Sequence, residues 1–149
     1  MIQKRKILAQ DLDCFLSEYL MGGYRQDRSS LTHIEIESGK IEGFINIEDY
    51  FRPSDGQFHF TVPLSLLWVS QLAIIYACLD NHLSSKQGES YLNKWNIVCK
   101  KPILQTHQIN IKILLMSKRK FKNNFVYKGN FDICNKSFYG QASFIFPVL

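Results

Sequence analysis

An uncharged run at residues 64–79, LSLLWVSQLAIIYACL, constrains the fold of this chain most. Pro63 stands directly before it, and proline is favoured at the first residue of a helix. A transmembrane helix needs about 20 predominantly apolar residues, whereas this run is shorter and includes two serines and a glutamine. A helix that is apolar on nearly every side must be surrounded by protein. We therefore expect a core helix without a membrane span, ending near Asp80-Asn81-His82.

Most of the remaining chain alternates apolar and polar residues with the period of two that is typical of β-strands. Residues 33–37 and 41–47 follow this pattern around a Ser38-Gly39 turn, which predicts a β-hairpin. Residues 50–61 are rich in turn residues and predict a loop ahead of the helix. After the helix, strands are predicted at residues 94–100, 108–113, 125–133 and 138–146. Their short connections favour a four-stranded antiparallel meander.

Residues 8–20 predict a further helix, because their apolar side chains fall on one helical stripe that Gly22-Gly23 ends. The expected order is therefore helix, hairpin, core helix and meander, in one α+β domain of 149 residues. An antiparallel sheet wrapped around one central apolar helix is the hotdog fold, which we expect here. A cone-shaped sheet of the ligand-binding or ketosteroid-isomerase type is the alternative, and enclosure of the core helix distinguishes the two.

Composition and residue spacing exclude several classes of protein. Hydrophobic residues make up 46% of the chain, which excludes wholesale disorder. The four cysteines and four histidines are dispersed, so neither a disulfide framework nor a metal site is expected, and no cofactor is implied. With no apolar signal run near the N-terminus, we expect a cytoplasmic protein. No zinc-finger, helix-turn-helix or RNP-like pattern indicates a nucleic-acid partner.

The net charge of +5 is modest, and its densest cluster is the run at residues 118–122, which includes Lys118 and Arg119. One interpretation is a surface for acidic partners, such as the phosphates of coenzyme A or an acidic carrier protein. The other interpretation is a solvated hairpin turn between two strands. The sequence leaves both open.

Four short motifs resemble the FcoT-like hotdog thioesterases. They are His59-Phe60-Thr61, Trp68-Val69-Ser70-Gln71-Leu72, Lys100-Lys101-Pro102 and Gly140-Gln141-Ala142-Ser143-Phe144. The resemblance extends in order and spacing over roughly residues 50–148. Members of this family act on long-chain fatty acyl-CoA, and relatives serve isonitrile lipopeptide pathways. The resemblance therefore implies a hotdog fold and thioester chemistry.

The family pattern places a tyrosine ahead of an Asp-x-Gly-His-like turn, and Tyr50 is a near match to that tyrosine. Asp55-Gly56 and His59 resemble the turn with two residues inserted. Thr61 stands in place of the asparagine that follows the turn in the family. In the helical Asn-Gln pair, Ser70 replaces the asparagine, while Gln71 keeps the glutamine. These departures remove two amides that would hold the thioester carbonyl or orient water.

Thioester chemistry needs a base and hydrogen-bond donors aimed at the carbonyl oxygen. His59 is the candidate base, because histidine is the side chain that ordinarily changes charge near neutral pH, and Asp55 orients it or acts itself. Gln71 would hold the carbonyl, and the N–H groups at the start of the helix offer an oxyanion hole. Tyr50, Thr61 and Ser70 are candidate substrate-binding residues, as are Lys118 and Arg119 for phosphates. The alternative is a strand-edge histidine beside an ordinary Ser-Asp-Gly turn.

The sequence thus predicts a hotdog hydrolase of acyl-CoA or acyl-carrier-protein thioesters. A hotdog dehydratase acting on a 3-hydroxyacyl thioester is an alternative, since the same residues suit both reactions. A hotdog subunit that binds an acyl chain without catalysis is another, because the asparagines are missing and the helix holds no carboxylate. The free edge strands of such a sheet can pair between copies, so we expect a homodimer or a dimer of dimers.

Overall fold

A computed structural model of the chain describes residues 22–147. The helix predicted at residues 8–20 lies outside this range. The elements are the 3-10 helix η3 (Gly23–Gln26), β1 (Arg28–Glu37), β2 (Lys40–Asp49), α2 (Val62–Asp80), β3 (Tyr91–Cys99), β4 (Ile109–Phe121), β5 (Asn124–Ile133) and β6 (Phe138–Pro147). The α+β class, the hairpin, the loop at residues 50–61 and the later strands are confirmed within the described residues.

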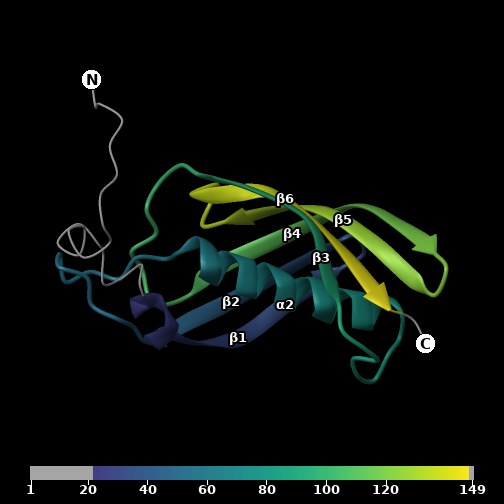
Figure 1. Cartoon of the computed structure of the whole chain (residues 1–149), viewed down its shortest axis with the longest axis horizontal. Coiled ribbons are helices and arrows are strands. Elements are labelled where there is room, and N and C mark those ends of the chain that lie inside the picture. Colours follow the sequence, from purple (N-terminus) through teal and green to yellow (C-terminus); the bar gives the residue numbers. More distant parts are fainter. Residues whose placement is uncertain (1–21, 148–149) are drawn as a thin grey trace, which may run out of the picture.

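The six strands form one antiparallel sheet in the order β1-β2-β4-β5-β6-β3. Figure 1 shows α2 lying along one face of this sheet, with β3 crossing over to the edge beyond β6. The prediction of a four-stranded meander was wrong, because β3 pairs with β6 and not with β4. Sequence alternation identifies a strand but does not select its neighbour, and the long connection after α2 lets β3 reach the far edge.

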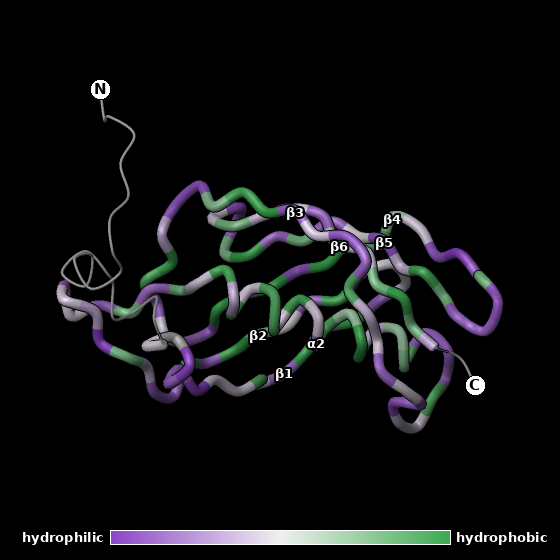
Figure 2. The backbone as a smooth tube through the Cα atoms, viewed as in Figure 1, coloured by the Kyte–Doolittle hydropathy of each residue, from purple (hydrophilic) through white to green (hydrophobic). Residues whose placement is uncertain are grey.

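Alternation along each strand divides the sheet into an inner face toward α2 and an outer face away from it. On β2, Ile41, Ile45 and Ile47 are buried between partly exposed polar or aromatic residues. The same pattern recurs on β4, β5 and β6, and the hydrophobic and hydrophilic stretches alternate along the strands in Figure 2. The inner face therefore supplies one side of the core, and α2 supplies the other.

The helix α2 begins at a well-formed cap and carries one buried stripe. Thr61 is the N-cap residue, and Pro63 occupies the first turn, as the sequence predicts. The buried residues of α2 are Leu64, Ser65, Val69, Leu72, Tyr76 and Ala77. They pack on β2, β4, β5 and β6. Leu72 is fully buried above Gly43, where an added Cβ would lie 2.6 Å from the leucine Cδ2.

The opposite side of α2 is not enclosed by the described chain. Leu67 and Leu79 are each 46% exposed, and Gln71 is exposed between them. Within the described residues the sheet therefore covers one side of α2, and the expected enclosure of the helix is seen on that side alone. With 19 residues and mean hydropathy 1.9, α2 is also long and apolar enough to cross a membrane, a test that core helices of soluble proteins pass as well. An apolar face of this kind is the usual mark of an interface.

Close backbone approach, which only glycine permits, joins the edge strand β3 to β6. A Cβ on Gly140 would lie 2.0 Å from the backbone oxygen of Asn96. A Cβ on Gly43 would instead meet the end of the Leu72 side chain, which can shift at a lower cost in free energy than the backbone.

We therefore expect Gly140→Ala to destabilise the fold by about 3 kcal/mol and Gly43→Ala by about 1 kcal/mol, within the usual range for overpacking. Urea unfolding curves of the two variants and the wild type measure this difference. Equal costs, or a neutral Gly140→Ala, would contradict the close approach of β3 to β6.

Candidate functional site

The loop at residues 50–61 holds the predicted pair of His59 and Asp55. The imidazole Nε2 of His59 lies 2.5 Å from Asp55 Oδ2. Asp55 Oδ1 accepts a second hydrogen bond, at 2.9 Å, from the Gln57 amide. That amide and the histidine ring hold the pKa of Asp55 below its ordinary value. Asp55 is thus an ionised partner held against the imidazole, as an orienting residue would be.

Two buried phenylalanines fix the histidine in its loop. Phe58 and Phe60 are 2% and 4% exposed, so the residue between them faces outward. The Phe60 amide also donates to the Ile103 carbonyl at 3.0 Å. Tyr50 packs edge-to-face on Phe58 with ring centroids 5.2 Å apart. Tyr50 therefore supports the loop by packing against Phe58. The side chains of His59 and Asp55 are 38% and 45% exposed.

The start of α2 is less open to an oxyanion than predicted. Pro63 has no N–H group, and the Leu64 amide is directed at the Thr61 side chain, 3.4 Å away. The Ser65 amide bonds the Thr61 carbonyl at 3.0 Å. Thr61 is therefore a helix cap in this structure, and its hydroxyl is engaged by the helix itself.

The predicted helix residues lie away from the histidine pair. Gln71 is exposed and Ser70 half-buried on α2. At 1.5 Å per residue, Gln71 lies about 13 Å along the helix from Val62. Within one chain the structure therefore joins His59 to Asp55 but does not bring Gln71 to that pair.

Lys118 and Arg119 lie near the opposite end of α2. A solvated hairpin turn was one of the two interpretations of the basic run, but its first residues belong to β4, which extends to Phe121. A β-bulge at Met116 shifts the alternation, because Leu115 pairs with Gly129 and Ser117 with Lys128. Beyond the bulge Lys118 pairs with Tyr127, so it shares the inner face with that residue.

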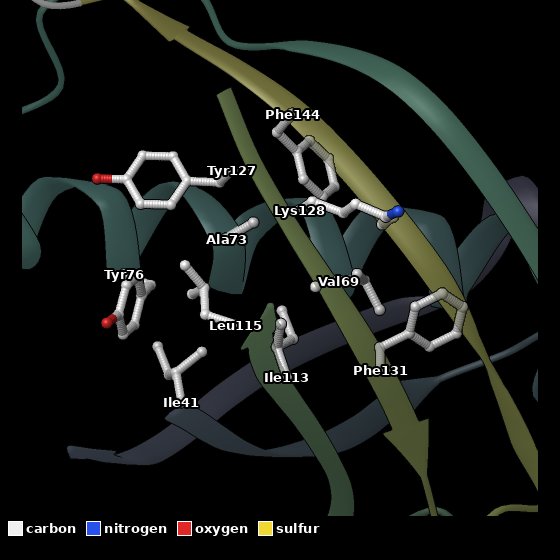
Figure 3. A pocket seen from close by; sticks show the side chains of 12 residues that line it. Ile41, Val69, Ala73, Tyr76, Ile113, Leu115, Tyr127, Lys128, Phe131 and Phe144 are labelled. Carbon is white, nitrogen blue, oxygen red and sulfur yellow. The ribbon is translucent and has the colours of Figure 1, made fainter. Parts of the chain in front are cut away.

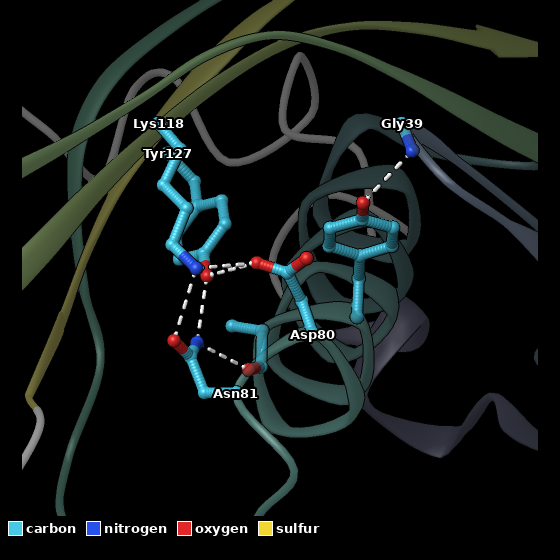
Figure 4. Close-up of polar contacts among 7 residues, drawn as sticks. Gly39, Asp80, Asn81, Lys118 and Tyr127 are labelled. Atoms are coloured by element: carbon cyan, nitrogen blue, oxygen red, sulfur yellow. Dashed lines mark hydrogen bonds and ion pairs between the residues drawn. The ribbon is translucent and has the colours of Figure 1, made fainter.

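A polar cluster that the sequence did not predict joins this end of α2 to the sheet (Figure 4). Lys118 Nζ bonds Asp80 Oδ2 at 2.7 Å and Asn81 Oδ1 at 3.0 Å. The Tyr127 hydroxyl donates to Asp80 Oδ2 at 2.8 Å and accepts from Asn81 Nδ2 at 2.7 Å. Asn81 Nδ2 also caps the Ala77 carbonyl at 2.7 Å. In the sequence, Asp80 and Asn81 signalled only the helix end, and Tyr127 only a core position.

Protonation in this cluster follows from its contacts. Burial opposes ionisation of Asp80, but Lys118 and Tyr127 together hold the Asp80 pKa below its ordinary value. Burial and the Asp80 carboxylate raise the pKa of Tyr127 to about 12. The tyrosine therefore stays protonated at neutral pH and is a hydrogen-bond donor, not a base. Lys118 is engaged here and is not presented to a phosphate near His59.

A small apolar cavity lies between α2 and the inner face of the sheet (Figure 3). Val69, Ala73 and Tyr76 line it from the helix, opposite residues of β2, β4, β5 and β6. Its volume of about 20 Å³ accommodates little more than one water molecule. A long acyl chain does not fit there. Among the described residues, no group of three or more His, Cys, Asp or Glu side chains could hold a metal ion.

No protein-family model matches this chain, and no curated protein shows significant similarity to it.

We expect Tyr127→Phe to cost about 1–2 kcal/mol of folding stability, because Asp80 and Asn81 each lose a hydrogen-bond partner. Tyr91→Phe is the matched control, since Tyr91 is 65% exposed. Chemical denaturation of both variants measures the difference. Equal stabilities would mean that the Tyr127 hydroxyl contributes nothing to the fold.

The stabilising effect of Asp80 should depend on pH. Its folded-state pKa is lowered, so its contribution is present above the unfolded-state pKa and is lost as the pH falls through the folded-state value. The stability difference between the wild type and Asp80→Asn should therefore be constant near neutrality and shrink below about pH 4. Thermal unfolding across this pH range measures it. A difference that grows on acidification would contradict the ion pair.

Proposed function

We propose that this protein is a cytoplasmic hotdog-type hydrolase of acyl-CoA or acyl-carrier-protein thioesters. The observation that supports this best is the His59–Asp55 hydrogen bond in the loop that leads into α2. An antiparallel sheet with one apolar helix along its inner face is common to the hotdog and the cone-shaped sheet. In the hotdog that we propose, the acyl chain and a second protomer cover the outward face of α2 and complete its enclosure. The resemblance of residues 50–148 to FcoT-like thioesterases adds the substrate class.

In this proposal His59 removes a proton from the attacking water. With Nε2 donating to the Asp55 carboxylate, Nδ1 is the basic nitrogen, and the carboxylate stabilises the imidazolium that forms. The water oxygen then attacks the thioester carbonyl, and the collapse of the tetrahedral intermediate expels the thiolate. That thiolate takes up the proton from the imidazolium, which returns the histidine to its neutral form.

A second copy of the chain would complete this site. The acyl chain finds no room in the cavity of about 20 Å³ beneath α2, so we place it along the outward face of the helix. Leu67 and Leu79 are exposed there, with Gln71 between them as a donor for the carbonyl. Because Gln71 lies far from His59 in its own chain, the proposal combines Gln71 of one protomer with the histidine pair of the other.

The edge strand β3 is the surface we assign to this homodimer. Tyr91, Leu92 and Val98 are 65%, 40% and 48% exposed along it. An edge strand with apolar side chains and unpaired backbone groups readily pairs with another strand. The other edge, β1, is less suited, because acidic Glu35 and Glu37 lie along it.

Non-catalytic acyl binding is a second candidate. Its support is the exposure of the histidine pair in one chain, together with a helix cap that occupies the expected oxyanion site. The dehydratase alternative uses the same His59–Asp55 pair.

A thiol-release assay across acyl-CoA chain lengths tests the hydrolase. We expect turnover by the wild type and a loss of about a hundred-fold or more in His59→Ala, as for removal of a general base. His107→Ala is the control, because that exposed histidine lies outside the site. Turnover unaffected by His59→Ala would remove the histidine from the chemistry. No thiol release at any chain length would favour acyl binding or dehydration.

The dimer is tested by light scattering on Leu92→Lys/Val98→Lys. Charges at these edge positions should convert the dimer to monomer, since two lysines would be buried without partners. Ile36→Lys on β1 is the matched control, because Ile36 is 44% exposed on the opposite edge. Dissociation by the control variant alone would move the interface to β1. A monomeric wild type would exclude the composite site.

A further inference from the structure

The outer face of the sheet is hollowed where β3, β6, β5 and β4 lie side by side. One hollow, open to solvent, has a volume of about 650 Å³, and a second open hollow has a volume of about 390 Å³. Asn96 and Gln141 line both, so the two hollows adjoin. A cavity of several hundred Å³ matches the size of sites for small organic ligands. Neither the core nor the proposed thioesterase site uses the side chains of Asn96 and Gln141, although Val98 of the proposed dimer edge also lines the larger hollow.

Strand register places a row of carboxamides across this face. Asn130 on β5 pairs with Gln141 on β6, and Gln141 pairs with Asn96 on β3. Directly opposed residues of an antiparallel sheet lie on the same face, about 5 Å apart. Leu114 continues the row on β4 and is 48% exposed. Asn96 Oδ1 accepts from the Gln141 backbone amide at 2.8 Å, so Asn96 offers its Nδ2 donor. The side-chain amides of Asn130 and Gln141 each offer a donor and an acceptor together, which is the pattern that matches the edge of an adenine base.

The neighbouring row, two residues further along each strand, has a different chemistry. It consists of Lys112, Asp132 and Tyr139 on adjacent strands. Lys136 follows in the β5–β6 turn, where its amide donates to Asp132 Oδ1 at 2.6 Å. Glu42 lies 3.8 Å from Lys112 and also contacts Lys40, which Glu37 pairs as well. Two lysines and one carboxylate line the larger hollow itself. Asp132 is the one carboxylate among the described residues that line the larger hollow.

Positive charge continues on the far side of the carboxamide row. Lys94 and Lys128 both pair with Ser143 and line the smaller hollow. Two copies of this face in contact would oppose lysines to lysines, which disfavours self-association there. A neutral sugar chain would leave the lysine charges unmatched. The face is instead complementary to an anionic ligand that also carries a planar hydrogen-bonding group.

We propose that this outer face binds an adenosine phosphate. Asn96, Asn130 and Gln141 hold the base edge, and Tyr139 with Leu114 provides the surface on which the ring lies. Asp132 accepts from the ribose hydroxyls, and Lys112 with Lys136 binds the phosphates. The same chemistry is presented by a free nucleotide and by the nucleotide portion of coenzyme A. This site is separate from the His59–Asp55 pair.

Isothermal titration of the full chain with ADP, adenosine, pyrophosphate and coenzyme A tests the proposal. We expect saturable ADP binding with a Kd below about 1 mM. Asn130→Ala/Gln141→Ala should weaken ADP and adenosine about ten-fold and leave pyrophosphate unchanged. Lys112→Ala/Lys136→Ala should weaken ADP and pyrophosphate similarly and spare adenosine. Lys122→Ala/Asn123→Ala, in the exposed β4–β5 turn, is the matched control.

The ligands also distinguish the two sources. Tighter binding of coenzyme A than of ADP supports the coenzyme, and the reverse supports the free nucleotide. Absence of saturable ADP binding overturns the proposal, as does binding that only the control variant weakens. Binding of a single-stranded oligonucleotide without binding of ADP overturns it in favour of a strand-binding face. Thiol release is measured separately, so the hydrolase and the nucleotide site can fail independently.

Discussion

Packing of α2 on the inner face of the sheet is the contact on which the rest of this structure depends. The helix has no charged residue between Val62 and Leu79, and its buried stripe meets four strands. Leu72 reaches full burial because Gly43 leaves room beneath it. Burial of such side chains contributes about 1.5–3 kcal/mol each. This contact fixes the two ends of α2, and the candidate site and the polar cluster lie at those ends.

Local features of the fold were predictable because they rest on short-range physics. The helix start at Pro63, the turn at Gly39 and the alternation on β5 follow from backbone restriction and side-chain period. The position of β3 was not predictable in this way, because strand order depends on contacts far apart in sequence. Enclosure of α2 is seen on one side only within the described residues, since an apolar helix face signals burial without identifying what buries it.

In the candidate site, too, the local contacts were predictable and the contacts between distant segments were not. His59 and Asp55 are four residues apart in one loop, so a local turn was enough to bring them together, and their contact followed the prediction. Gln71 required a tertiary relation that the sequence does not contain, and the single chain leaves it apart from the pair. The cluster of Asp80, Lys118 and Tyr127 joins three distant segments, and no spacing in the sequence marks it.

The β-bulge at Met116 decides which face of the sheet each basic side chain of the run at residues 118–122 lies on. The one extra residue at the bulge reverses the side-chain alternation of β4. Neighbouring basic residues of the run at 118–122 therefore face opposite sides of the sheet. Lys118 becomes an internal counter-ion, while Arg119 pairs with Val126 and faces the other way. Deletion of Met116 would remove the bulge and leave Lys118 opposite Tyr127. A strand that kept every residue but lost the bulge would instead place Lys118 opposite Val126 and Arg119 opposite Phe125, without changing the net charge. That register would turn the Arg119 guanidinium to the inner face beside Phe125 and take the Lys118 ammonium away from Asp80. The electrostatics of this end of the protein are therefore set by strand register, and the number of basic residues alone does not determine them.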